Sequence, residues 1–151
     1  MADFAFNLLT HSPERLNVIS TRLGESPAAK FTMEDLKKPV KLGPDSNHVL
    51  CAAGDEIEGF VDSLDAATNG GFSFGGVARG NRGFRVAAQI GAGQGATAAK
   101  LGDLVVADDQ IALNTKGKAQ VKTGTPTRHM WRILALNGTG AAGTDVILEL
   151  L

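Results

Sequence analysis

Glycine divides this chain into short apolar segments, and that division limits what the chain can fold into. There are 19 glycines in 151 residues, and from residue 45 onward most apolar runs lie between two of them. Glycine supplies the backbone freedom for tight corners and destabilises the interior of a regular helix. Short runs between such corners predict the strands of an all-β fold, a small β-barrel or sandwich. We expect strands at 48–53, 56–62, 84–90, 103–107, 110–115, 118–123, 129–137 and 144–150.

One kind of corner occurs twice in this pattern. Gly54-Asp55 precedes an apolar segment that begins at Ile57, and Gly102-Asp103 precedes another that begins at Leu104. Glycine allows the chain to turn, and the aspartate side chain can accept hydrogen bonds from nearby backbone N–H groups. We therefore predict that both pairs form corners at comparable edges of one barrel.

The composition of the first 44 residues differs from that of the rest of the chain. They contain four of the five prolines and few residues that could build a core. Residues 12–24 predict a helix, with Ser12 as N-cap and Pro13 in the first turn, although the β-branched residues from Val18 onward also suit a strand. Residues 32–38 predict one further helical turn before Pro39. We expect an N-terminal arm, residues 1–44, carrying a short helix, and a glycine-rich β domain, residues 45–151.

Composition narrows the function classes. The formal net charge is −1 and the sequence pI is about 6.3, which argues against a dedicated nucleic-acid-binding domain. No basic leader peptide and no apolar stretch approaching about 18 residues is visible, so we expect no membrane partner and synthesis in the cytoplasm. The single cysteine, Cys51, lies in an apolar run and is expected to be a buried, inert thiol.

The motifs that resemble catalytic or cofactor sites are incomplete. The segment "GAGQGATAAK" lacks the Gly-Lys-Ser/Thr and the glycine spacing of phosphate-binding loops, and a flexible loop accounts for it better. His48 and Cys51 provide two ligands where a zinc site needs three or four. Acidic pairs such as Asp108-Asp109 point to opposite faces of a strand and are expected in turns and at the surface. We expect no cofactor, no metal and no enzymatic activity.

Some apolar side chains are candidates for contact with a partner. Phe4, Phe6 and Leu8 alternate in a short extended pattern, so they either anchor the arm on a neighbour or cover a gap in their own barrel. Phe72 and Phe74 point the same way if their segment is extended. They either fold back onto the core or are buried against a partner, because exposing both is unfavourable.

Basic side chains form a second group of candidates. Arg79, Arg82 and Arg85 make "ARGNRGFR" a basic and flexible segment, and Arg79 and Arg82 are the contact candidates in it. This segment either contacts phosphates or an acidic protein surface, or is an ordinary solvated loop.

The last third of the chain resembles a known family. The segments "AAKLGDLVVADDQIALNTKGKAQV" and "WRILALNGTGAAGTDVILELL", with "GDEIEGFVDSL" earlier, are similar to the decoration, or cement, proteins of tailed-bacteriophage heads. The resemblance covers residues 48–64 and 99–151. It implies a virion structural protein on the outer surface of the head, assembled in the host cytoplasm, that binds the major capsid protein. It also implies a homotrimer or a dimer, and no direct contact with nucleic acid.

Two other functions remain open from the sequence. The chain has a suitable length for a small trimeric β-fold nucleotide hydrolase, but it shows no carboxylate motif for a metal-bound triphosphate. A structural module of a phage tail or fibre is the second alternative.

Overall fold

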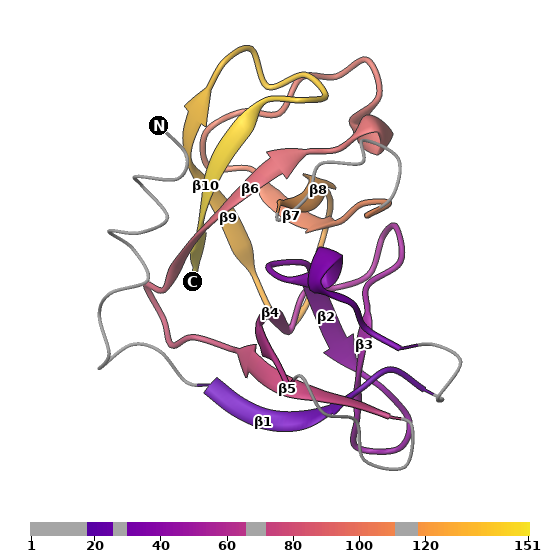
Figure 1. Cartoon of the computed structure of the whole chain (residues 1–151). Coiled ribbons are helices and arrows are strands. Elements are labelled where there is room, and N and C mark those ends of the chain that lie inside the picture. Colours follow the sequence, from indigo (N-terminus) through magenta and orange to yellow (C-terminus); the bar gives the residue numbers. More distant parts are fainter. Residues whose placement is uncertain (1–17, 26–29, 66–71, 111–117) are drawn as a thin grey trace.

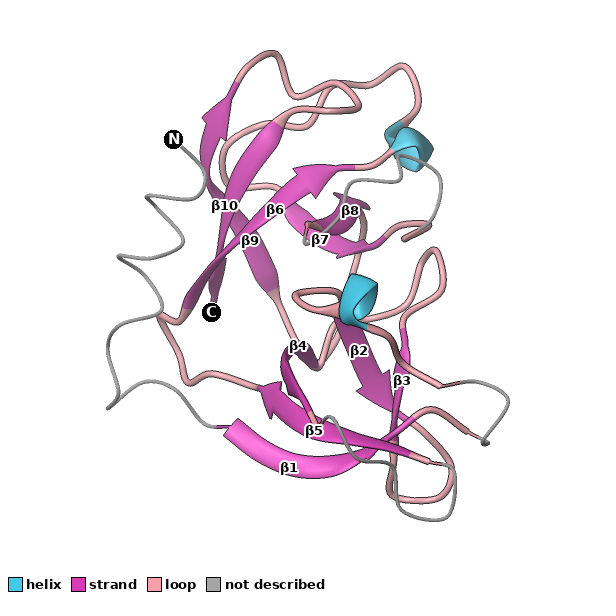
Figure 2. Cartoon of the chain, in the orientation of Figure 1, coloured by secondary structure: helices cyan, strands magenta, loops and turns pink. Residues whose placement is uncertain are grey.

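The computed structural model describes residues 18–25, 30–65, 72–110 and 118–151, which form a nearly all-β protein with two closed five-stranded barrels. This confirms the predicted fold class. The strands β6–β10 gather in the upper half of Figure 1 and β1–β5 in the lower half. The helical segments of the described residues are two 3-10 turns, which lie between strands (Figure 2).

Each barrel takes its five strands from one continuous part of the chain. The strand order around the first barrel is β1-β3-β2-β4-β5, and around the second it is β10-β6-β8-β7-β9. The strands of the first barrel are β1 Val18–Leu23, β2 Pro39–Leu42, β3 His48–Leu50, β4 Gly59–Leu64 and β5 Ser73–Ala78. The strands of the second barrel are β6 Arg85–Ile90, β7 Leu104–Ala107, β8 Ala119–Thr123, β9 Trp131–Asn137 and β10 Asp145–Leu150.

The two barrels have the same topology. In each, the first strand is parallel to the third, the second lies between the third and the fourth, and the fifth pairs with the fourth and the first. A 3-10 turn joins the first two strands in both cases, η2 Met33–Asp35 and η3 Ala92–Gln94. The fourth strand carries a β-bulge at the same point, at Asp62 in β4 and at Leu134 in β9. The chain is a tandem repeat of one five-stranded unit.

The strand registers also show that the core residues of the two barrels occupy equivalent positions. The interior of the first barrel is formed by four fully buried side chains, one each from β1, β2, β4 and β5. The strand pairing places a buried aliphatic residue at each equivalent position of the second barrel. These pairs are Leu23 with Ile90, Val40 with Val105, Val61 with Ile133, and Val77 with Leu148.

The Gly-Asp corners are four-residue turns of one design. At residues 52–55, Gly54 has φ +93° and the Asp55 N–H donates to the Ala52 carbonyl at 3.1 Å. The Asp55 carboxylate accepts the Ala52 N–H at 2.7 Å, which closes the turn a second time. The corner at 100–103 repeats these bonds at 3.2 and 2.8 Å, with φ +86° at its glycine. Positive φ at the third residue is what a type II turn requires, and glycine adopts it without strain.

Each of these corners is also bonded to a facing strand. In each corner, the N–H of the third residue donates to the carbonyl of one residue on the facing strand. The N–H of that same facing-strand residue donates to the carbonyl of the corner's fourth residue. The same bonds occur at 35–38, 81–84 and 141–144, and they form a glycine-type β-bulge at the strand entrance. The corner at 100–103 faces Ile133 of its own barrel, whereas 52–55 faces Ala107 of the other barrel. The prediction that both corners edge one barrel is therefore wrong.

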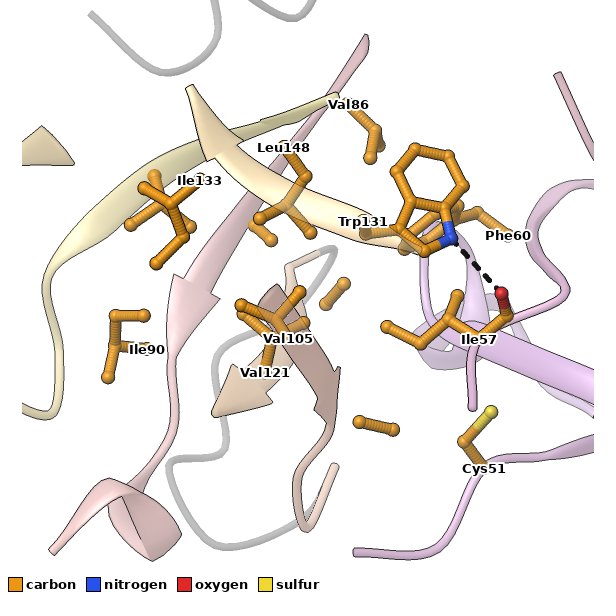
Figure 3. Close-up of a cluster of buried hydrophobic side chains, with 14 of the residues drawn as sticks. Cys51, Ile57, Phe60, Val86, Ile90, Val105, Val121, Trp131, Ile133 and Leu148 are labelled. Atoms are coloured by element: carbon orange, nitrogen blue, oxygen red, sulfur yellow. Dashed lines mark hydrogen bonds between the residues drawn. The ribbon is translucent and has the colours of Figure 1, made fainter. Parts of the chain in front are cut away.

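The barrels share one hydrophobic core at their junction. Ile57 and Phe60 of the first barrel pack in the same cluster as the buried residues of the second. Trp131 is fully buried there, and its indole N–H donates to the Ile57 carbonyl at 3.0 Å (Figure 3). The Trp131 ring meets the rings of Phe60 and Phe84 edge to face, with centroids 5.2 and 6.1 Å apart. Edge-to-face contact of this kind adds to the hydrophobic stabilisation of the junction.

The structure corrects the predictions for the first 44 residues. The helix predicted over 12–24 is wrong for residues 18–23, because these form β1 and pair along their whole length with β5. The predicted boundary at residue 44 lies between β2 and β3 of one barrel, so residues 18–25 and 30–44 are not an arm separate from the β domain. The predicted turn from Thr32 is confirmed as η2, with Thr32 as its N-cap.

Trp131 provides a test of the shared core. Replacing Trp131 with Phe keeps an aromatic ring but removes the indole N–H, which leaves the buried Ile57 carbonyl without its donor. We expect a loss of about 1–3 kcal/mol in the free energy of unfolding. Urea unfolding followed by circular dichroism should show one transition in both proteins. Two separate transitions, or unchanged stability, would contradict the shared core.

Candidate functional site: the outer face of β1 and β5

The structure places four of the predicted contact residues near β5. Phe72 precedes β5 and Phe74 lies within it, both half-buried, while Arg79 and Arg82 follow the strand. Phe4, Phe6 and Leu8 lie outside the described residues. Arg82 is exposed in the corner at 81–84.

The two phenylalanines belong to a surface that strand alternation creates. Inward residues of β1 and β5, such as Leu23 and Val77, fill the first barrel, so the residues between them face outward. The outward residues define what we call the aromatic face: Val18, Ser20 and Arg22 of β1 with Phe72 and Phe74 beside them. Val18 is 40% exposed, which is high for a large aliphatic side chain on a strand.

Arg22 is the charged residue of the aromatic face. Its guanidinium lies 4.6 Å from the centroid of the Phe72 ring, a cation–π distance. Its nearest carboxylate, on the largely exposed Asp45, is 3.7 Å away, which is a loose ion pair. Within the described part of the chain, the buried Nε of Arg22 finds no hydrogen-bond partner. Because Nε is buried, only the Nη groups, one of which forms the loose ion pair with Asp45, can meet an acceptor from outside the chain.

The second barrel carries the same surface with different chemistry. The register makes Arg85, Ala87 and Gln89 of β6 the equivalents of Val18, Ser20 and Arg22, and Asp145 of β10 the equivalent of Phe74. We call these residues, with Glu149, the sister face.

The polar groups of the sister face bind one another. Arg85 and Arg132 each reach the Glu149 carboxylate at 2.9 Å, and Lys118 reaches Asp145 at 2.9 Å. Burial raises the pKa of Glu149, but the hydrogen bonds from Arg132 and Arg85 outweigh it and the pKa is lowered overall. The carboxylates of the sister face are thus paired with the chain's own cations, although the buried Nε of Arg132, like that of Arg22, has no hydrogen-bond partner among the described residues.

Arg79 belongs to a second polar cluster, centred on Glu58. Arg79 pairs with the Glu58 carboxylate at 2.9 Å, and Leu42 donates its backbone N–H to the same group at 3.0 Å. Nε2 of the buried His48 ring lies 3.8 Å from the Glu58 carboxylate. Nδ1 of the same ring forms a hydrogen bond with the Thr21 hydroxyl. Burial lowers the pKa of His48, so its neutral form is favoured there. The sequence did not indicate this cluster, since its members come from five separate segments.

Glu56 connects like segments of the two barrels. It lies between the third and fourth strands of the first barrel, and its carboxylate accepts bonds from residues 127–129, between the third and fourth strands of the second. Thr127 donates from both its N–H and its hydroxyl at 2.7 Å, and Arg128 donates its N–H at 3.0 Å. These hydrogen bonds, those from Thr127 first, lower the pKa of Glu56 to about 2.

Glu56 gives a pH-dependent prediction. Because its pKa in the folded protein lies below the ordinary glutamate value of 4.5, its contribution to stability is complete above that value and is lost as pH falls toward 2. We expect Glu56→Gln to melt at a lower temperature than wild type at pH 6, with the difference shrinking between pH 4.5 and 2. Glu25→Gln, at an exposed glutamate, serves as control. A difference that stays constant with pH would count against the Glu56 contact.

The glycine-rich loop after β6 is built around a buried carboxylate. Asp108 is 2% exposed, and it accepts the Gly93 N–H at 2.6 Å. A Cβ at Gly91 or Gly93 would lie 2.2 or 2.3 Å from an Asp108 oxygen, so both positions require glycine. The loop thus encloses a buried carboxyl group. The expected surface position of Asp108 is wrong, since its carboxylate forms this contact.

Three further findings concern metal ligands, the cysteine and membrane-spanning helices. Among residues 18–25, 30–65, 72–110 and 118–151, no group of three His, Cys, Asp or Glu side chains is placed to hold a metal ion. Cys51 is buried as expected, and burial raises the pKa of its thiol to about 12. In the described part of the chain, no helix has the length and apolar character needed to cross a membrane.

Comparison with known proteins gives no relative: no protein family, no characterised protein and no solved structure matches this chain.

Proposed function

We propose that this chain is a decoration protein of a tailed bacteriophage, which binds the outside of the assembled head and stabilises it. The proposal starts from the resemblance of residues 48–64 and 99–151 to that family. The observation that carries it is the contrast between the two equivalent faces of the tandem barrels. One face binds its own charges in ion pairs, while the other presents aromatic rings and a loosely paired arginine.

Stabilisation of the head would follow from mass action. A protein that binds the assembled shell and not the loose subunits shifts the equilibrium toward the shell. Many copies, or one oligomer spanning several subunits, multiply modest contacts because each later contact forms within the same complex. A homotrimer or dimer on the major capsid protein is the form we propose, on the outer surface of the virion.

The stability of heads tests this function. Heads purified without this protein should release their DNA at a lower temperature than complete heads, and adding the pure protein back should restore the higher temperature. Release is followed by the fluorescence of a DNA-binding dye during heating. An unrelated β-barrel protein of similar mass is the control for non-specific protection. Equal release temperatures with and without the chain would contradict the proposal.

The predicted N-terminal anchor needs a separate test. Since β1 begins at Val18, a chain lacking residues 1–17 keeps every described strand and loses Phe4, Phe6 and Leu8. If these residues anchor the chain, we expect about a tenfold loss of affinity for heads in cosedimentation, as for loss of one interface anchor. Circular dichroism should show the same β content. Undiminished affinity would remove the anchor from the mechanism.

A further inference from the structure

The tandem repeat allows one residue position to be compared in two surroundings within one molecule. Arg22 and Gln89 are equivalent, and each lies opposite the fifth strand of its barrel. The Gln89 amide donates to the Asp145 carboxylate at 3.4 Å and to the Gly143 carbonyl at 3.2 Å. Arg22 lies opposite Phe74, which is the equivalent of Asp145. The carboxylate that accepts a hydrogen bond from Gln89 in the second barrel therefore has no counterpart at this position of the first barrel.

The aromatic face therefore combines apolar area with an unfilled acceptor position. Phe72 and Phe74 are half-buried, and Val18 is 40% exposed at the other end of the face. The Arg22 guanidinium lies over the Phe72 ring with its side chain 27% exposed, so the ring restricts where its donors can point before a partner arrives. A guanidinium matches a carboxylate through two parallel hydrogen bonds, which neither a hydroxyl nor an amide can fully replace.

We propose that the aromatic face docks an apolar segment of the capsid subunit that presents a carboxylate to Arg22. This inference rests on the proposed function and adds the surface and the chemistry of its partner. The carboxylate takes the place that Asp145 occupies in the sister barrel. The apolar side chains beside it cover Phe72 and Phe74, and the sister face remains in solvent.

Two substitutions convert the aromatic face toward the sister face. Phe74→Asp removes the ring and supplies an internal acceptor for Arg22, and the second barrel shows that this topology tolerates aspartate at that position. Arg22→Gln removes the charge and leaves the rings. In cosedimentation with purified heads, each should weaken binding about 10- to 30-fold, as expected for the loss of a central anchor. Arg22→Gln should also reduce the salt dependence of binding.

The sister face provides the matched control. Arg85→Ala removes an exposed arginine at the position equivalent to Val18, and it should leave the affinity within twofold of wild type. Melting temperatures of all variants establish that they are folded. If Phe74→Asp and Arg22→Gln bind heads as wild type does, the aromatic face is not the docking surface, although the decoration function stands. If wild type does not bind heads, both proposals fail.

Cross-linking identifies the partner directly. Ser20→Cys and Ala87→Cys place a thiol at equivalent outward positions of the two faces, and each can carry a benzophenone. Cys51 will not compete for the label, because it is buried and its pKa is raised to about 12. We expect position 20, and not position 87, to cross-link to a capsid peptide containing Asp or Glu. Cross-links only between copies of this chain, or equal yields from both positions, would overturn the docking surface.

Discussion

The rest of the structure depends on the burial of Trp131 between the two barrels. Among the described residues, the first barrel has four fully buried aliphatic side chains in its own interior, and a unit of this size buries too little surface to be very stable alone. Ile57 and Phe60 extend from it into the core of the second barrel and complete the packing around the indole. The corner at 52–55 then fixes the same junction through backbone bonds to Ala107.

Like segments meet at this junction. The segment between the third and fourth strands of one barrel contacts the corresponding segment of the other, through Glu56 and residues 127–129. Contact between identical surface patches is the property of a two-fold dimer, so the chain has the form of such a dimer joined into one polypeptide. Within one polypeptide the two units can differ in sequence, and the aromatic face and the sister face differ in chemistry at equivalent positions.

The sequence predicted the second barrel better than the first. The strands β6, β7, β8, β9 and β10 all lie within predicted segments, because each is a short run with a glycine near at least one of its ends. The capping pattern before β1 predicts a helix. Pairing with β5 outweighs this local preference and makes the segment a strand. β5 was missed because it contains Gly75. A Cβ at Gly75 would lie 2.1 Å from the Ser63 carbonyl oxygen. Glycine is needed here because two strands approach each other closely, and not because the segment has to be flexible.

The repeat itself is not visible in the residues, because "VISTRL" and "RVAAQI" are equivalent strands that differ at every position. Only the register and the shared bulge reveal the equivalence. The candidate site was predicted in part. Phe72 and Phe74 were expected on one side of an extended segment, and they lie on one face. Arg22 was missed, since its role depends on a partner 50 residues away in the chain.

Native-state hydrogen exchange tests the central claim, that the junction makes two barrels one cooperative unit. The N–H groups of Gly54 and Ala107 bond across the junction, and those of Val61 and Ile133 bond within the separate barrels. If the account is correct, all four exchange with the same opening free energy, that of global unfolding. Junction amides that open at a much lower free energy than Val61 and Ile133 would show that the barrels are independent, and would contradict it.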